Sequence, residues 1–149
     1  AASGVADLAC NHYDRAGDRA AARSNFTEAV AHLNAGLTEL GKLVEGPDRS
    51  RRELALLLKL GPALTIMKGM TSPEMEEAYG RAQRTARSLG DGTGLFKANW
   101  GLWVQAIARC DFETTRDRTQ ALVTIGKHST DPDLLPQVLH LPWSTAFLC

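Results

Sequence analysis

The sequence predicts an all-α protein, an α-solenoid of about seven helices arranged as antiparallel pairs. Apolar residues recur at three- and four-residue spacing along almost the whole chain of 149 residues, whereas alternating strand patterns are scarce. The breaks between apolar stretches are short, so successive helices must pack antiparallel. Small and aromatic residues also return at a near-constant interval, which is typical of repeat proteins.

The first helical hairpin is expected at about residues 5–44. Asn25 is the candidate N-cap of its second helix, and Glu28 stands three residues later, as in a capping box. Gly46 and Pro47 then break the chain. These signals place one helix before Asn25 and one after it.

The second hairpin is expected at about residues 49–89. Gly61 and Pro62 should kink its first helix, because proline removes a backbone donor. Ser72 and Pro73 suit the N-cap and the first helical position of its second helix. Gly90 is the natural residue to end that helix.

The third hairpin is expected at about residues 95–128, after a flexible loop at residues 91–94, with Asp111 as the cap of its second helix. An unpaired helix follows at about residues 132–148. Its Leu139, Trp143 and Phe147 are four residues apart and so share one face. We expect this apolar stripe to be partly exposed, so that the isolated chain forms a homodimer through the C-terminal helix.

An internal repeat is visible in the positions of small and aromatic residues. Gly61 and Gly101 are 40 residues apart, and so are Ala82 and Leu122. The tetratricopeptide (TPR) consensus has a period of about 34 residues, and HEAT and armadillo repeats have about 40–47. The period alone leaves these classes open. The small and large residues on the paired helices, such as Tyr13 with Gly17, favour a TPR-like repeat.

Several short runs, taken in order, carry a more specific resemblance, and they include Gly61-Pro62-Ala63-Leu64, Leu89-Gly90-Asp91 and Trp100-Gly101-Leu102-Trp103. Together they resemble the TPR-like region of large bacterial signalling proteins, in which a STAND-type P-loop ATPase precedes that region and an adenylate/guanylate cyclase domain or a helix-turn-helix regulator lies elsewhere. The resemblance implies a noncatalytic protein-interaction or sensor segment. Thr115 and Thr119 depart from the pattern and should loosen the third hairpin.

Charge and cysteine content exclude several classes of function. Seventeen basic residues balance seventeen acidic ones, which argues against a nucleic-acid partner. The three cysteines are odd in number and far apart, so neither a disulfide framework nor a zinc site is expected, and the cytoplasm is the expected location. No apolar stretch is long enough for a membrane span. The expected partner is another protein or a neighbouring domain of the same chain.

No catalytic set is recognisable in the sequence. The run from Gly36 to Lys42 resembles a phosphate-binding loop, but Leu43 stands where that loop needs Ser or Thr, and the run lies within a helical pattern. Cys110 precedes a helix start, where a thiol can be reactive, but a buried packing cysteine is favoured. We therefore expect no metal, no cofactor and no enzymatic activity in this chain.

The expected binding surface is a concave face lined by the first helix of each pair. Polar residues that flank the packing positions are its candidates, although a solvated helix face is the favoured explanation for them. Two functions remain open, a protein-interaction segment and a small-molecule sensor with its ligand in the concave groove, and an independent enzyme ranks third. The candidate binding residues are Asn11, Asp14, Asp18, Thr65 and Gln105.

Overall fold

The computed structural model describes residues 2–129 and 131–148, and over these residues the chain is an all-α solenoid. Each helix packs against the next one along the chain, which confirms the predicted fold class. Helices α1 and α2 are followed by two further pairs, then by a short 3₁₀ segment, η1, and by α7. The bounds are α1 (Ala2–Ala22), α2 (Phe26–Leu40), α3 (Pro47–Lys68), α4 (Pro73–Leu89), α5 (Gly92–Ala108), α6 (Phe112–Lys127), η1 (Pro132–Leu134) and α7 (Leu135–Leu148).

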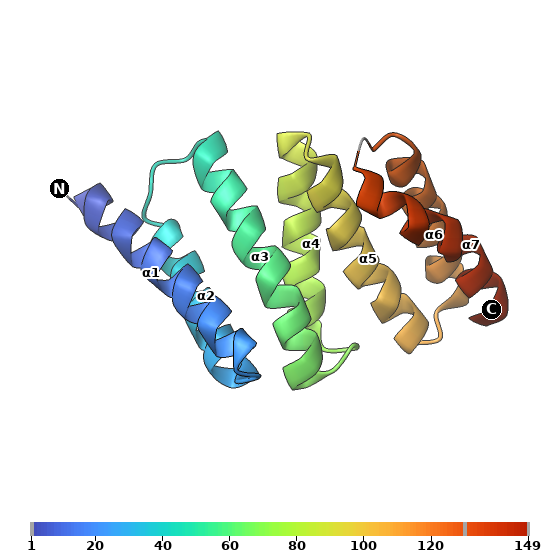
Figure 1. Ribbon diagram of the computed structural model, residues 1–149, viewed down its shortest axis with the longest axis horizontal. Coiled ribbons are helices and arrows are strands. Elements are labelled where there is room, and N and C mark those ends of the chain that lie inside the picture. The colour runs from blue at the N-terminus through green and yellow to red at the C-terminus, as the bar shows by residue number, and fades with distance from the viewer. Residues whose placement is uncertain (1, 130, 149) are drawn as a thin grey trace.

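The helices form two layers. The odd-numbered helices α1, α3, α5 and α7 lie side by side facing the viewer in Figure 1, and the even-numbered helices lie behind them. Apolar side chains fill the space between the layers. Leu33 and Leu57 belong to one cluster, and Phe96 and Leu122 belong to a second one nearer the C-terminus. The odd-numbered layer is therefore a continuous surface built from the first helix of each pair.

The turn between α1 and α2 has a compact form. Ser24 adopts a left-handed conformation with φ of 58°. The next residue, Asn25, donates its backbone N–H to the carbonyl of Ala20 over 2.9 Å and caps α2. This arrangement satisfies a free carbonyl at the end of one helix while the next helix begins. The same turn recurs at Ala86, Gly90 and Asp91 and again at Ala106, Cys110 and Asp111.

This turn corrects two expectations from the sequence. The prediction of a loop at residues 91–94 is wrong, because α5 already begins at Gly92. Asp91 caps this helix, and its Oδ1 accepts the N–H of Gly94 over 2.8 Å. Cys110 is exposed rather than buried. Its φ of 56° makes it the left-handed residue of a turn, and such residues lie at the surface.

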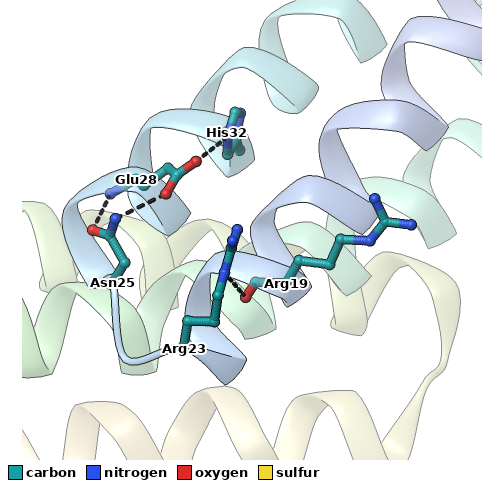
Figure 2. Close-up of polar contacts among 5 residues, drawn as sticks. All are labelled: Arg19, Arg23, Asn25, Glu28 and His32. Atoms are coloured by element: carbon teal, nitrogen blue, oxygen red, sulfur yellow. Dashed lines mark hydrogen bonds and ion pairs between the residues drawn. The ribbon is translucent and has the colours of Figure 1, made fainter.

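The cap at the start of α2 differs in one respect from a standard capping box (Figure 2). Asn25 Oδ1 accepts the N–H of Glu28 over 3.3 Å, which confirms the expected N-cap. The Glu28 carboxylate accepts from the Asn25 side-chain amide over 2.8 Å, not from its backbone N–H. That N–H is already bound to Ala20. Figure 2 also shows His32 against Glu28, and Arg23 donating to the carbonyl of Arg19.

Two buried threonines in α6 have partners that the repeat pattern did not anticipate. Thr119 accepts a hydrogen bond from the indole N–H of Trp103 over 2.9 Å and donates to the carbonyl of Thr115 over 2.8 Å. Both threonines are buried. Thr119 thus gives the buried indole a polar partner that an aromatic residue could not supply.

The last helix, α7, follows the η1 segment and continues through Pro142. Leu139 on this helix is 67% exposed. The side chains of Trp143 and Phe147, which complete the expected apolar stripe, lie outside the described residues. Over residues 2–129 and 131–148, none of the helices combines the length and apolar character that crossing a lipid bilayer requires.

Candidate binding groove on the odd-numbered helices

The ring of Tyr79 lies between two glycines on neighbouring helices. A Cβ atom added to Gly61 on α3 or to Gly101 on α5 would stand only 2.4 Å from that ring. Only a residue without a side chain fits so close to an aromatic ring on either side. The 40-residue interval between the two glycines therefore has a physical cause. They occupy equivalent positions in successive hairpins, and both contact the ring of Tyr79.

The hydroxyl end of Tyr79 is also held. Burial raises the pKa of this phenol, and a hydrogen bond with Thr65 opposes the rise only in part. Thr65 in turn donates its hydroxyl to the carbonyl of Gly61 over 2.9 Å. Tyr79 is consequently a neutral, fixed side chain that reaches from α4 through to the odd-numbered layer.

Beside this ring a groove of about 250 Å³ opens between α3, α5 and the start of the last helical segment. We call it the odd-helix groove. Its walls are mainly apolar and aromatic, and Lys97 is the charged residue among them. The groove is lined by Leu58, Pro62, Tyr79, Phe96, Lys97, Trp100, Leu134 and Gln137.

Apolar surface around the groove is exposed to solvent. Ile66 lies one turn beyond Pro62 on α3 and is 61% exposed. Trp100 is half-buried, with its ring centroid 5.1 Å from that of Trp103 and 6.0 Å from that of Phe96. Clustered exposed apolar residues are typical of surfaces that contact a partner or ligand, whereas scattered ones are ordinary.

The other half of the odd-numbered layer is closed by charged side chains. Lys59 of α3 donates to Asp14 over 2.7 Å and to Asp18 over 2.9 Å, both on α1. Arg52 of α3 pairs with Asp7 and also donates to Asn11 over 2.8 Å. We call this set of contacts the α1–α3 seam. Burial alone would lower the pKa of Lys59, but its hydrogen bonds to the two carboxylates outweigh burial and raise it.

The five candidate residues from the sequence lie in three different places. Asn11, Asp14 and Asp18 belong to the α1–α3 seam, where cations of the neighbouring hairpin occupy them. Thr65 lies against Tyr79 below the groove. Gln105 is only 4% exposed and donates to Glu76 of α4 over 3.3 Å. The structure thus brings three of the five together, and none is among the residues that line the odd-helix groove.

The residues that do line the groove were overlooked because they are apolar. The spacing of Trp100 and Trp103 favours core packing over stacking on a ligand, and apolar periodicity gives no sign that Leu58 or Pro62 faces solvent. A signal was present in α3, which carries two apolar stripes. Leu58, Pro62 and Ile66 follow one another at four-residue spacing on a face separate from that of the buried leucines.

Comparison of the chain with known protein families, curated proteins and solved structures finds no match. Function is therefore inferred from the geometry of this chain. Within the described residues, no group of three or more His, Cys, Asp or Glu side chains is arranged to hold a metal ion.

Proposed function

We propose that this chain is a noncatalytic protein-interaction segment of a larger bacterial signalling protein and that it holds its partner in the odd-helix groove. One observation carries the proposal. Pro62 and Ile66 of α3 are exposed at the groove, with Ile66 61% exposed, and Trp100 of α5 is only half-buried there. Covering such surface is favourable by about 25 cal/mol per Å². A partner with apolar side chains would gain this free energy on binding.

The signalling context of the proposal is supported by the sequence resemblance. The parent protein would be an adenylate/guanylate cyclase or an ATPase-type regulator, with its catalytic domains elsewhere in the chain. The partner would be another protein or a neighbouring domain. A nucleic acid is disfavoured, since the formal net charge is zero and gives no general attraction to phosphate.

The test is selection from a random peptide library displayed on phage, with the immobilised chain as bait. Pro62→Asp introduces a charge at an exposed position in the groove wall without removing a backbone hydrogen bond. Ala31→Asp on the exposed face of α2 is the matched control. Selected peptides should bind Pro62→Asp at least tenfold more weakly than the original chain and bind Ala31→Asp equally well.

Circular dichroism establishes that both variants remain folded. Failure to enrich any peptide, or equal affinity for the chain and for the Pro62→Asp variant, would contradict the proposed groove. An affinity lost only in the Ala31→Asp variant would move the interaction to the even-numbered layer.

A small-molecule sensor is the second candidate function, and the mainly apolar and aromatic lining of the same groove favours it. Its volume of about 250 Å³ lies just below the range for ligand pockets, about 300–1,000 Å³, so the ligand would be small. A metabolite that raises the melting temperature of the chain but not that of Pro62→Asp would support this function. A screen in which no metabolite produces such a difference would count against it.

A further inference from the structure

A second groove lies on the opposite layer, between α2 and α4 and above α3. Its volume is about 230 Å³. We call it the even-helix groove. The floor is apolar and well packed, with Leu60 and Leu64 of α3 between Val30 of α2 and Ala78 of α4, all of them buried. Charged side chains of α3 and α4 form the rim.

The rim carries two cations, Lys68 and Arg81, and two carboxylates, Glu74 and Glu77. Each cation is already engaged, one of them by a third carboxylate outside the lining. Lys68 pairs with Glu74, and Arg81 Nη2 donates to Glu53 Oε1 of α3 over 2.6 Å. Glu77 stands one turn before Arg81 on α4, a spacing at which the two would ordinarily pair. Because Arg81 is held by Glu53, Glu77 is the carboxylate left over among the charged residues of the lining.

We propose that the even-helix groove binds a small ligand that carries a primary ammonium group on an apolar body. The ammonium donates to the Glu77 carboxylate, and the apolar body covers the floor formed by Leu60 and Leu64. A charge-assisted hydrogen bond of this kind is stronger than a neutral one, especially beside an apolar wall. The volume is below that of most drug-sized pockets, which restricts the ligand to about the size of an amino acid.

Two sources of this chemistry exist, a simple amine and an apolar amino acid. Asn34 lines the groove from α2, across from the carboxylates and Arg81 on α4. Its side-chain amide and the remaining N–H groups of Arg81 can donate to a carboxylate. The geometry therefore favours the amino acid. This site lies on the opposite layer from the odd-helix groove and does not rest on the proposed interaction function.

Isothermal titration of the whole chain with three probes tests the proposal. L-leucine carries ammonium, carboxylate and apolar body, 3-methylbutylamine lacks the carboxylate, and N-acetyl-L-leucine lacks the ammonium. We expect L-leucine and 3-methylbutylamine to bind and N-acetyl-L-leucine to fail. Tighter binding of L-leucine than of the amine identifies an amino acid as the ligand class. Equal binding of the two identifies an amine, and both results support the ammonium site.

Glu77→Gln keeps the shape of the exposed side chain and removes its charge, so both active probes should bind at least tenfold more weakly. Glu113→Gln, an exposed carboxylate on α6, is the matched control and should leave binding unchanged. If the carboxylate of L-leucine lies beside Asn34, Asn34→Ala should weaken the binding of L-leucine more than that of 3-methylbutylamine. The proposal is overturned if neither active probe binds at millimolar concentration, if N-acetyl-L-leucine binds as well as L-leucine, or if Glu77→Gln binds unchanged.

Discussion

The ring of Tyr79 on α4 occupies space that Gly61 on α3 and Gly101 on α5 leave open. A methyl group at either glycine should therefore displace the ring and disturb the packing of α4 against both α3 and α5. Gly101→Ala would bring Cβ to 2.4 Å from the ring. Forcing the ring aside should cost about 1–3 kcal/mol of unfolding free energy. A gain in helix propensity of about 1 kcal/mol offsets part of that loss. Urea denaturation followed by circular dichroism measures the net effect.

Gly80→Ala is the control for this substitution. Gly80 is also inside a helix, but the nearest atom to its added Cβ is the flexible Nη1 of Arg84 at 3.6 Å. It should therefore show the propensity gain alone and be neutral or stabilised. If Gly101→Ala and Gly80→Ala had the same stability change, Tyr79 would not be confined by the glycine.

At the scale of one element, the turn that joins helices contains residues in a strained conformation. Ser24 and Cys110 both adopt positive φ, which favours glycine. Ser24→Gly should relieve the strain of about 1–2 kcal/mol, less the entropy cost of glycine, and so raise the unfolding free energy by about 0.5–1 kcal/mol. Ala55→Gly, at an exposed position inside α3, should instead lower it by about 1 kcal/mol. Thermal denaturation of the two variants measures whether each is stabilised or destabilised. A destabilised Ser24→Gly variant would argue against the left-handed conformation of Ser24.

The α1–α3 seam predicts a dependence of stability on pH. The pKa of Lys59 is raised in the folded chain, so its contribution is complete below the unfolded pKa and disappears as pH rises through the higher folded value. Lys59→Met should lower the unfolding free energy at neutral pH by at most about 1 kcal/mol, because the groups are partly exposed. The difference from the original chain should shrink above pH 10.5 and at high salt. A difference that does not change with pH would show that packing, not charge, is responsible.

Helix ends were predictable where the signal is local. Asn25, Ser72 and Asp111 cap helices through contacts three residues ahead, which a sequence displays directly. The start of α5 was missed because its glycines resemble a loop. Gly94 belongs to a helix instead, close enough to α3 that an added Cβ would meet Leu54 at 2.8 Å. That contact depends on the neighbouring hairpin.

The odd-helix groove was less predictable for a related reason. Whether Trp100 or Pro62 faces the core or solvent depends on which helix lies beside it, and apolar periodicity does not distinguish two apolar faces of one helix. The polar candidates Asp14 and Asp18 pair with Lys59 in the α1–α3 seam. Lys59 comes from a different hairpin, so the sequence alone does not show this pairing. The fold class could be predicted from local periodicity, whereas the residues of the odd-helix groove could not, because their exposure depends on contacts between hairpins.

Across the whole molecule, the odd-numbered layer divides into an ion-paired half and an apolar half. The α1–α3 seam satisfies the charges at one end, and the odd-helix groove leaves apolar surface at the other. Leu139 on α7 is a further exposed apolar side chain near the C-terminus. Contact with a partner would therefore bury most apolar surface, and gain most free energy, in the C-terminal half of this layer.

Self-association through α7 is a prediction at the same scale. Leu139 is 67% exposed, and covering it against a second copy would be favourable. Light scattering of the isolated chain should give a mass near twice that of the monomer, and Leu139→Asp should restore the monomer mass. A strictly monomeric chain at high concentration would contradict this dimer.

Fluorine NMR of the chain labelled with 5-fluorotryptophan tests the odd-helix groove most directly. Trp100 lines the groove, whereas Trp103 is buried against Thr119, so the two rings should respond differently to a peptide selected on this chain. The chain has three tryptophans, and loss of one signal in Trp100→Phe and of another in Trp103→Phe assigns these two resonances. We predict that the Trp100 resonance shifts as the peptide saturates the chain while that of Trp103 moves less. A peptide that binds to saturation and leaves the Trp100 resonance unmoved would contradict the groove as the binding surface.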